Sequence, residues 1–327
     1  MLLARVRAAA EVLVVELDQA RRASRAWADE RSSDALVEAA LSACLGRLAE
    51  SGCWGEANRL PSGELWRIAG PLLETGVLQR HARFKPRGYA GDYEMLHWIC
   101  TNYCCDDPLG RVFDRYFQRQ AAPAAVRSRT EQTAAALADH CRQSQAGIYQ
   151  VLSVGAGPAE DLRGALARLP ADCRLRLRAT LLDLDPEALE FARGRLLAFL
   201  PSESIRTVRE NLYRLPRHAR CQDLVATPDA LVCSGLFDYL DDAVAVEMLR
   251  LFWQRLAQRG LLVVGNFSSH NPTRAYMEWI GNWYLTYRTA DQLRWLAGQA
   301  GIPAEEFTID VDSQGAQLLL TARKGTQ

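Results

Sequence analysis

The feature that most constrains the fold is a buried strand that runs into two closely spaced glycines. The segment 150–157, QVLSVGAG, is an apolar run that ends in Gly155 and Gly157, and a helical pattern begins at Glu160. Glycine adopts the tight turns that join a strand to a helix, and it lets a ligand approach the backbone closely. A strand, a glycine turn and a helix in this order are typical of a parallel sheet with helical crossovers.

Strand-like and helical patterns alternate from this turn to residue 323. Further strands are expected at 179–185, 229–236 and 260–267, with a hairpin around Ser313–Gly315 inside 307–323. Helices are expected at 160–169, 186–200 and 243–259. This alternation predicts an α/β fold with a doubly wound, mostly parallel sheet in which one late strand is antiparallel. Such sheets bind ligands beyond the carboxyl ends of their strands.

The chain up to about residue 145 has a helical pattern throughout. One apolar stripe recurs at helical spacing, at Leu2, Val6, Ala9, Leu13 and Leu17. Further helices are expected at 35–48, 64–78 and 122–144, and the segment 83–105 combines a loop containing glycine and proline with a short helix. We therefore predict a helical N-terminal cap domain at 1–145 and a sheet domain at 146–327, with a cap insertion at about 268–290.

The balance of charge bears on the partners of the protein. Lysine and arginine total 39, as do aspartate and glutamate, so no positive excess would draw nucleic acid or an anionic membrane. No stretch is long and apolar enough to span a bilayer, and the opening segment lacks the pattern of a signal peptide. The nine cysteines lack disulfide or metal-ligand spacing. We expect a cytoplasmic protein with a small-molecule substrate and no metal; nothing fixes its oligomeric state.

The residues that follow the first two strands indicate what the sheet binds. Glu160 stands where a dinucleotide-binding turn has its third glycine, which disfavours a pyrophosphate. Asp183 ends the next strand, at a position suited to hydrogen-bond a ribose diol. Asp185 precedes Pro186 and is expected to cap the following helix. The pattern therefore favours a ligand that carries a ribose but no pyrophosphate.

Four motifs in order resemble the class I S-adenosylmethionine-dependent methyltransferase domain. They are VGAGPAEDL (154–162), LDLDPEAL (182–189), ENLYRLP (210–216) and LVCSGLFDYL (231–240). The likeness covers about residues 149–325. It implies a Rossmann-like, seven-stranded sheet and an enzyme that uses S-adenosylmethionine as methyl donor or substrate.

The resemblance also implies which residues contact S-adenosylmethionine. Gly155, Ala156 and Gly157 would face its methionine part, and Asp183, followed by Leu184, would bind the ribose. Asn211 and Leu212 would flank the adenine, and Ser234, Gly235 and Leu236 would line the sulfonium end.

Two further stretches resemble a narrower bacterial subgroup. PRGYAGDYEML (86–96) and NPTRAYMEWIGNWYLTYRT (271–289) are similar to methyltransferases named for 3-hydroxy fatty acid methyl ester biosynthesis. The subgroup also resembles azetidine-2-carboxylate synthases, which cyclise S-adenosylmethionine and release methylthioadenosine. The leading hypothesis is this cyclisation. Methyl ester formation on a 3-hydroxy fatty acid and a catalytically inactive binding module are the alternatives.

Aromatic rings gather in these same two stretches. A sulfonium is a permanent cation, and aromatic faces attract cations. The rings are those of Tyr89, Tyr93, Trp279, Trp283, Tyr284 and Tyr287. We interpret Trp279 and Trp283 as an apolar stripe that packs the cap. We predict a functional role for Tyr89 and Tyr93, because they lie with Asp92 on a loop that contains glycine.

The two reactions make different demands on the site. Methyl transfer to a carboxylate needs only that the carboxylate be held in line with the methyl group. Cyclisation needs a group that accepts a proton from the amine. The predicted catalytic residues are Tyr89, Asp92, Tyr93, Tyr239 and Asn266, with Glu94 and Asp238 as further candidates. His270 is interpreted as structural or solvent-facing. Arg288 either holds a carboxylate or forms a buried ion pair.

Overall fold

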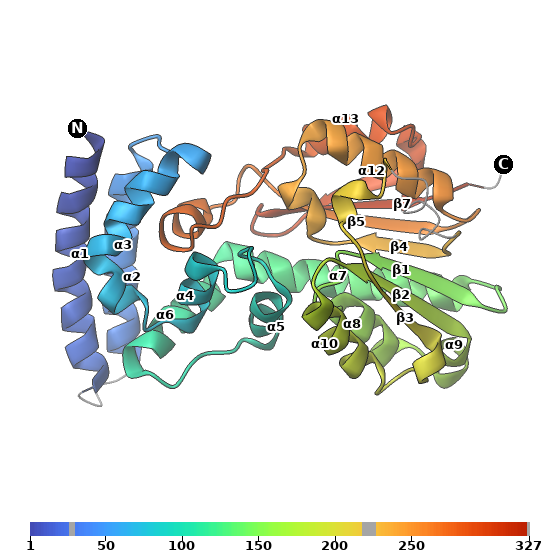
Figure 1. Ribbon diagram of the computed structural model, residues 1–327, viewed down its shortest axis with the longest axis horizontal. Helices are drawn as coiled ribbons and strands as arrows, with labels where there is room; N and C mark the ends of the chain where they lie inside the picture. The colour runs from blue at the N-terminus through green and yellow to red at the C-terminus, as the bar shows by residue number, and fades with distance from the viewer. Residues whose placement is uncertain (26–29, 218–226, 326–327) are drawn as a thin grey trace. The chain divides into compact units, whose positions relative to one another are not determined.

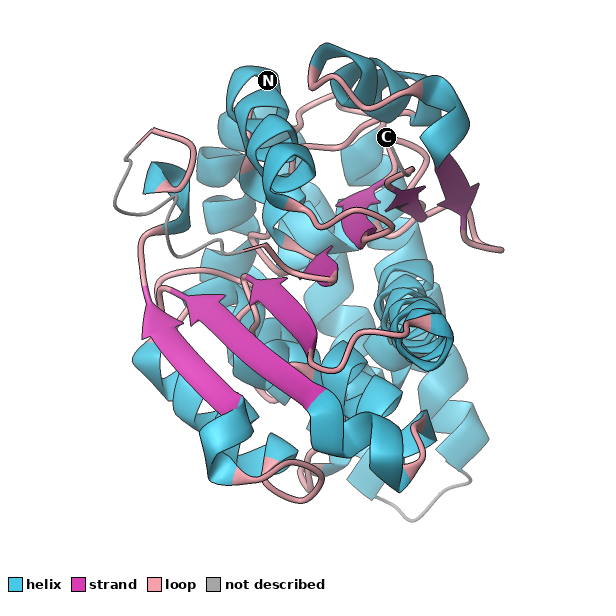
Figure 2. Cartoon of the chain, turned by 90° about the vertical axis from the view of Figure 1, so that its right-hand side faces the viewer, coloured by secondary structure: helices cyan, strands magenta, loops and turns pink. Residues whose placement is uncertain are grey.

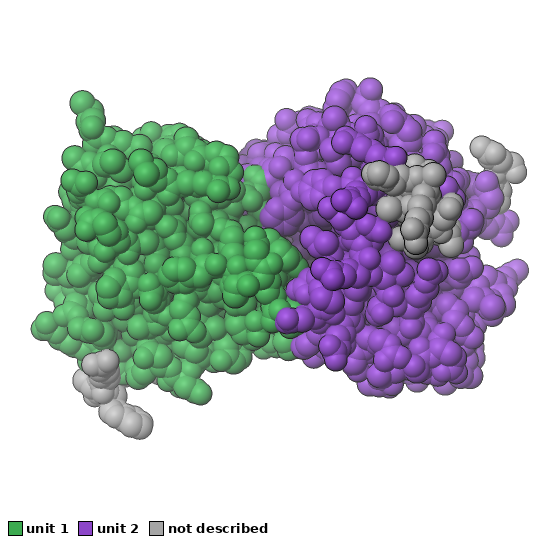
Figure 3. Space-filling model, in the orientation of Figure 1, with its two compact units in different colours: residues 1–124, 272–285 green, residues 125–271, 286–327 purple. Residues whose placement is uncertain are grey.

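The computed structural model describes residues 1–25, 30–217 and 227–325. The chain forms two compact units, which Figure 3 distinguishes by colour. Unit 1 comprises Met1–Ala124 and Pro272–Leu285, and unit 2 comprises Ala125–Asn271 and Thr286–Gln327. The division therefore falls after Ala124, whereas the sequence predicts a boundary near residue 145. The second stretch of unit 1 lies inside the predicted insertion at 268–290.

The described residues of unit 1 are mainly helical. The helices are α1 (Leu2–Arg25), α2 (Glu30–Ala49), η1 (Gly55–Asn58), α3 (Arg59–Leu73), α4 (Val77–Phe84), α5 (Tyr93–Thr101), α6 (Pro108–Arg119) and the π-helix η5 (Tyr276–Ile280). Helix α1 packs against α2 and α3. Its predicted stripe is confirmed at Val6, Leu13 and Leu17, which are fully buried.

The helix predicted at 64–78 is in fact two helices. Helix α3 ends at Leu73, and α4 begins after Gly76, whose backbone is extended. A Cβ at position 76 would lie 2.9 Å from Cβ of Phe113, so the tight turn requires glycine. The apolar pattern continues across the break because both helices bury one face. Helix α6 lies within the predicted helical region, but its bounds were not predicted, although Asp107 caps it by accepting from the N–H of Gly110 at 2.7 Å.

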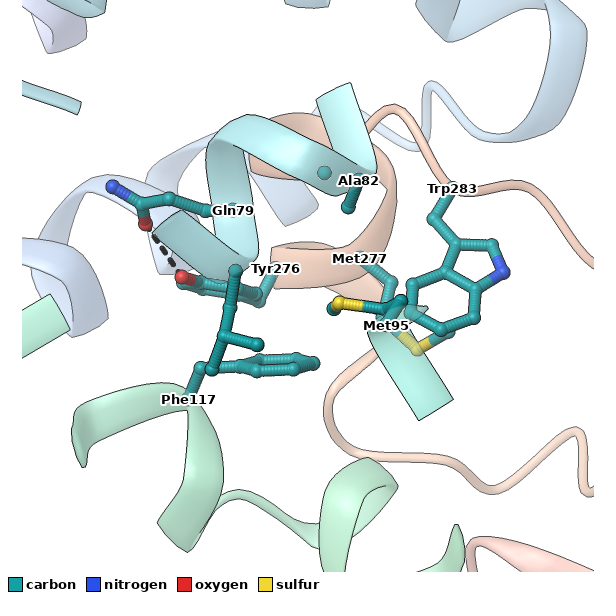
Figure 4. A pocket seen from close by; sticks show the side chains of 9 residues that line it. Gln79, Ala82, Met95, Phe117, Tyr276, Met277 and Trp283 are labelled. Atoms are coloured by element: carbon teal, nitrogen blue, oxygen red, sulfur yellow. Dashed lines mark hydrogen bonds between the residues drawn. The ribbon is translucent and has the colours of Figure 1, made fainter. Parts of the chain in front are cut away.

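The segment 272–285 completes the core of unit 1. The indole Nε1 of Trp66 donates to the carbonyl of Ile280 at 2.8 Å, and the hydroxyl of Tyr276 donates to Oε1 of Gln79 at 2.5 Å (Figure 4). Trp279 and Trp283 are buried, as expected of packing residues. A cavity with room for about one water molecule is lined by Leu78, Gln79, Ala82, Met95, Phe117, Tyr276, Met277, Gly281 and Trp283.

In the described residues of unit 2, seven strands form one sheet in the order β3-β2-β1-β4-β5-β7-β6 (Figure 1). The strands are β1 (Tyr149–Val154), β2 (Leu177–Asp183), β3 (Ile205–Arg209), β4 (Ala230–Cys233), β5 (Leu261–Phe267), β6 (Phe307–Val311) and β7 (Gln317–Arg323). The first five run parallel, and β7 is antiparallel to both β5 and β6. The predicted mostly parallel, doubly wound α/β fold is confirmed.

Helices cover both faces of this sheet (Figure 2). They are α7 (Ala121–Gln143), α8 (Glu160–Arg168), α9 (Ala171–Arg176), α10 (Pro186–Leu196), α12 (Asp242–Arg255) and α13 (Ala290–Gln299), with the short 3₁₀ helices η2 (Ser202–Ser204), η3 (Leu212–Arg214), η4 (Leu236–Tyr239) and η6 (Ala304–Glu306). Val151 packs with α7, α8 and α10, and Leu152 packs with α12 and α13. Neighbouring strand residues point to opposite faces, so both faces are buried.

Helix α7 explains why the boundary lies earlier than predicted. Leu137, Ala138 and Cys141 share an apolar core with Tyr149 of β1. Nδ1 of His140 lies 2.6 Å from the Tyr149 hydroxyl. Most of this helix therefore packs on the sheet rather than within the helical unit.

Among the elements of unit 2 that were not predicted are strand β3 and helix α13. Strand β3 lies at one edge of the sheet, and its Arg206 and Thr207 are exposed. An edge strand of this kind lacks the apolar run that marks a buried one. Helix α13 begins at a capping box formed by Thr289 and Gln292, a signal that the sequence does contain.

No helix within the described ranges combines the length and the apolar character that crossing a membrane requires. The cysteines in those ranges are free thiols, and Cys221 lies outside them.

Candidate functional site

The carboxyl end of β1 forms a turn with left-handed backbone angles. Gly155 and Gly157 have φ values of +64° and +49°, a region that favours glycine. The N–H groups of Gly155 and Ala156 both donate to the carbonyl of Leu182, at 2.9 and 3.1 Å. The turn is thereby fixed to the end of β2, and its backbone angles account for both glycines.

Asp183, the last residue of β2, presents a buried carboxylate to this turn. Its Oδ2 accepts from the N–H of Gly157 at 2.9 Å, and its Oδ1 accepts from the N–H of Asp185 at 3.0 Å. Burial raises the pKa of the Asp183 carboxyl, and the two N–H groups oppose the rise. Each oxygen keeps a further lone pair, so the carboxylate can accept from two neighbouring hydroxyls. Asp185 accepts from the N–H of Glu187 at 2.8 Å, which confirms the predicted cap.

Leucine side chains from other strand ends lie beside the glycine turn. A Cβ added to Gly155 would lie 3.6 Å from Cδ1 of Leu212 and 3.6 Å from Cβ of Leu236. Leu212 belongs to η3, after β3, and Leu236 begins η4, after β4. Leu184, which follows Asp183, is 53% exposed. The ends of three strands thus offer apolar surface near one buried carboxylate.

Asn211 and Tyr239 take part in the links between these strand ends. Oδ1 of Asn211 caps η3 by accepting from the N–H of Tyr213 at 3.1 Å, and its own N–H donates to Glu210 at 2.8 Å. The Tyr213 hydroxyl donates to the carbonyl of Tyr239 at 3.1 Å. This bond connects η3 to η4. The roles predicted for Asn211 at the adenine and for Tyr239 in catalysis stay predictions.

Asp161, which was not among the predicted site residues, joins α8 to the loop after β4. Its Oδ2 accepts from Oγ of Ser234 at 2.8 Å, and its Oδ1 accepts from the N–H of Leu162 at 2.7 Å. Burial raises the pKa of the Asp161 carboxyl. The residue lies inside the motif VGAGPAEDL, four positions after Gly157, which is the signal that could have identified it.

Asn266, a predicted catalytic residue, is buried in a hydrogen-bond network with Asp238. Its Nδ2 donates to Oδ1 of Asp238 at 3.0 Å and to the carbonyl of Thr286 at 2.9 Å. The N–H of Phe267 donates to the same Asp238 oxygen at 2.5 Å. Asn266 is fully buried, so its amide holds β5 against η4, and a catalytic role for it stays a prediction.

Arg288 completes this network. Its Nη1 donates to Oδ1 of Asn266 at 2.6 Å and to the carbonyl of Phe237 at 2.9 Å. Its Nη2 donates to the carbonyl of Leu240 at 2.7 Å and to Oδ1 of Asp242 at 2.8 Å, and its Nε donates to the same oxygen at 3.0 Å. Of the two roles considered for Arg288, these contacts support an ion pair, which joins the buried guanidinium to the exposed carboxylate of Asp242.

Arg129 of α7 is a second buried arginine, which was not among the predicted site residues. The residue is 4% exposed. Its Nη1 lies 3.5 Å from Oδ2 of Asp238 and donates to Oε1 of Gln317 at 3.3 Å. Its Nη2 lies 3.7 Å from the position of a Cβ on Gly235. Its Nε is buried and has no hydrogen-bond partner in the part of the chain that the structure describes. Nothing in the local sequence distinguishes this arginine from exposed ones.

The predicted catalytic residues of the cap lie in unit 1. Asp92 is fully buried; its Oδ1 caps α5 by accepting from the N–H of Met95 at 2.9 Å, and its Oδ2 lies 2.6 Å from Nε2 of His81. The guanidinium carbon of Arg87 lies 4.5 Å from the ring centre of Tyr93. Tyr89 is partly buried. The contacts of Asp92 are structural, and the catalytic roles of Tyr89, Asp92 and Tyr93 stay predictions.

Protonation of Asp238 should make the stability of the protein depend on pH. Burial raises the pKa of this carboxyl from 3.8 to about 6. The folded protein then holds a proton that the unfolded chain releases, so the free energy of unfolding falls as pH rises from about 4 to about 6. The full effect is about 3 kcal/mol. Replacement by asparagine, Asp238→Asn, should remove this fall.

The measurement is urea unfolding of the native protein and Asp238→Asn at several pH values between 4 and 7. The difference between their free energies of unfolding cancels the titration that both share. The native protein should lose stability relative to the variant as pH rises. A difference that is constant across this range contradicts the prediction.

Comparisons with known proteins bear on the fold. No protein family matches the chain, and no curated protein matches its sequence. A solved structure of a Bordetella parapertussis protein, described as a possible exported protein, is 21% identical with a TM-score of 0.58, and the match covers 97% of both chains. The CurJ carbon methyltransferase is 12% identical with a TM-score of 0.53, and the match covers 99% of this chain and 92% of that one. The chain therefore has a methyltransferase-type fold.

Proposed function

We propose that this protein is an enzyme that binds S-adenosylmethionine in unit 2 and consumes it. The observation that carries the proposal is the carboxylate of Asp183, which accepts from the N–H of Gly157 at 2.9 Å beside a turn flanked by leucines. A buried carboxylate with spare lone pairs suits a ribose diol, and apolar side chains suit a heteroaromatic base. The four sequence motifs support the same ligand.

Unit 2 contains residues of suitable chemistry for each part of S-adenosylmethionine. Asp183, followed by Leu184, accepts bonds from the ribose hydroxyls, and Asn211 and Leu212 border the adenine. Gly155, Ala156 and Gly157 let the backbone approach the methionine part, because the left-handed turn has no side chain at its glycines. Ser234, Gly235 and Leu236 lie toward the sulfonium. When bound, S-adenosylmethionine supplies an electrophilic carbon next to a sulfonium.

The first reaction is cyclisation to azetidine-2-carboxylate. The amine of S-adenosylmethionine attacks its own γ-carbon, methylthioadenosine leaves with the bonding electron pair, and one proton passes from the amine to a basic group. Unit 2 holds carboxylates suited to accept it, because burial raises the pKa of Asp161 and brings that of Asp238 to about 6. Tyr239 and Asn266 contact or adjoin Asp238, and Tyr89, Asp92 and Tyr93 are the candidates from unit 1.

Methyl transfer to the carboxylate of a 3-hydroxy fatty acid is the second candidate. It is supported by the resemblance of 86–96 and 271–289 to methyltransferases named for 3-hydroxy fatty acid methyl ester biosynthesis. An acceptor carboxylate is already an anion, so this reaction needs alignment with the methyl group and no proton acceptor.

Removal of the charge at position 183 should weaken nucleoside binding. Asp183→Asn should lower the affinity for S-adenosylhomocysteine by about 1–3 kcal/mol, since hydroxyls bond more strongly to a carboxylate than to an amide. The measurement is calorimetric titration. Asp185→Asn is the matched control, because asparagine caps a helix as well as aspartate does. If Asp183→Asn and this control bind S-adenosylhomocysteine with equal affinity, Asp183 does not bind the ribose.

The reaction is decided by mass spectrometry of purified protein incubated with S-adenosylmethionine alone. We expect methylthioadenosine and an equal amount of a cyclic C4 amino acid. Appearance of S-adenosylhomocysteine only when 3-hydroxy fatty acids are added would assign methyl transfer instead. Binding of S-adenosylmethionine without either product would identify an inactive binding module and refute the enzyme.

The hydroxyl of Tyr93 should matter for turnover and not for binding. Tyr93→Phe keeps the ring that contacts Arg87 and removes the group that would orient or accept a proton. We expect kcat to fall by about tenfold or more, with the Kd for S-adenosylmethionine unchanged. Tyr103→Phe, at a more exposed ring of unit 1, is the control. Equal kcat values for the two variants would leave Tyr93 with a packing role.

A further inference from the structure

We propose that unit 1 contains a binding site for phosphate, formed by Arg83, Lys85 and Tyr284. Arg83 and Lys85 lie at the carboxyl end of α4, and Tyr284 lies in the stretch 272–285 that belongs to the same unit. The ligand is inorganic phosphate or the phosphate group of a small organic monoester. The site goes beyond the proposed function, because its three side chains belong to unit 1, whereas S-adenosylmethionine is proposed to bind in unit 2.

The side chain of Lys85 is positioned at a cost to the backbone. Its φ is +48°, in the left-handed region that favours glycine at the end of a helix. Its Nζ donates to the carbonyl of Asn282 at 2.6 Å, and Asn282 has a left-handed φ of +49° itself. An ammonium carries three donors, and this bond uses one of them. Two N–H groups of Lys85 are therefore available to a ligand.

Arg83 is a half-buried cation that the protein does not pair with an acid. Its Nη1 donates to Oγ of Ser62 at 3.0 Å, and its guanidinium carbon lies 5.2 Å from the ring centre of Trp66. Burial lowers the pKa of the guanidinium, and the group that opposes this fall in the described residues is Tyr284 rather than a carboxylate. The fork of Nε and Nη2 is thus available to an oxyanion.

Tyr284 adds an unused donor beside these cations. Its hydroxyl is buried and has no hydrogen-bond partner in the part of the chain that the structure describes. Burial raises the pKa of this hydroxyl, and the neighbouring Ser62 and Arg83 oppose the rise. A buried hydroxyl without an acceptor costs free energy. An oxyanion held by the guanidinium would supply the acceptor.

Positive charges gather around Lys85 and oppose its own charge. Burial is the main cause that lowers the pKa of its ammonium to about 8, and Arg83 and Arg59 lower it as well, while Glu56 opposes them. Glu56 is already paired with Arg59, at 2.6 Å. An anion at this point would offset both the burial of the ammonium and the repulsion from its neighbours.

The excess of positive charge matches a dianion. Glu278, an acid that acts on Tyr284, is paired with Arg274 at 2.7 Å, so the charges of Arg83 and Lys85 are not neutralised. A phosphate monoester carries a charge of about −1.5 to −2 at pH 7 and three strong acceptor oxygens. These oxygens suit a guanidinium fork, an ammonium and a phenol together. A carboxylate has one charge and two oxygens, and it would leave one cation unbalanced.

The test uses lysine as the reporter, because Lys85 and Lys324 are the two lysines of the sequence. Native protein labelled with ¹³C at the lysine Cε gives one NMR signal for each, and Lys324→Arg assigns the two signals. Millimolar inorganic phosphate should raise the pKa of Lys85 by about 1 or more and leave that of Lys324 unchanged. Lys324 donates to backbone carbonyls of unit 2, so it reports the general effect of salt. Acetate, and sodium chloride at equal ionic strength, should not reproduce the change.

Two variants then assign the donors, with the Lys85 signal as the readout. Tyr284→Phe keeps the ring and removes the hydroxyl, and Arg83→Gln keeps a donor for Ser62 and removes the charge. Each should weaken the binding of inorganic phosphate about tenfold or more. Without phosphate, Arg83→Gln should raise the pKa of Lys85, because one opposing cation is lost. Arg80→Gln, at an exposed arginine of the same helix, should change neither quantity.

The source of the phosphate group is decided by a comparison of two ligands. Phenyl phosphate that binds more tightly than inorganic phosphate identifies an organic monoester, and the reverse order identifies the free ion; both results support the site.

Three results would overturn the proposal. The first is a pKa of Lys85 that phosphate leaves unchanged, or changes no more than that of Lys324. The second is an equal response to acetate, and the third is unaltered phosphate binding by both Tyr284→Phe and Arg83→Gln. None of these results bears on the proposed function, because binding of S-adenosylhomocysteine is measured separately.

Discussion

The guanidinium of Arg288 fixes the loop on which the candidate site depends. It donates to the carbonyls of Phe237, within η4, and of Leu240, just after η4, and it also holds Asn266 of β5. A buried guanidinium that loses its partners destabilises a fold by about 3–5 kcal/mol, so other conformations of this loop are strongly disfavoured. The loop supplies Ser234 and Leu236. A residue some fifty positions later in the chain thus determines where they lie.

The site combines an excess of buried acid with apolar walls. Asp161, Asp183 and Asp238 lie at the carboxyl ends of neighbouring strands or in the helix that follows, and burial raises the pKa of all three. Nη1 of Arg129 lies 3.5 Å from Oδ2 of Asp238, and the charge of Arg288 also acts on this carboxyl. A ligand with a positive centre offsets the cost of keeping these carboxylates ionised out of water. The same charges oppose a phosphate, in agreement with the absence of a third glycine at Glu160.

The sequence predicts those parts of the structure that depend on near neighbours. The turn at Gly155 and Gly157 and the cap at Asp185 are local, and the alternation of buried strands with helices sets the fold. The break at Gly76 was missed because it depends on Phe113, a residue distant in sequence. Arg129 was missed because burial distinguishes it, and burial is decided by tertiary packing. Strand β3 was missed because its exposed edge has no apolar run.

Unit 1 is built from two stretches of chain, and this has a consequence for the order in which the protein folds during synthesis. Hydrogen bonds join the two stretches: Gly55 bonds to Glu278, Trp66 to Ile280 and Gln79 to Tyr276. These partners emerge from the ribosome some two hundred residues later, after the first five strands of unit 2. The core of the N-terminal helices therefore stays incomplete until these residues have been synthesised. A chain truncated before residue 285 would lack part of both units. The unit that is synthesised first is completed late.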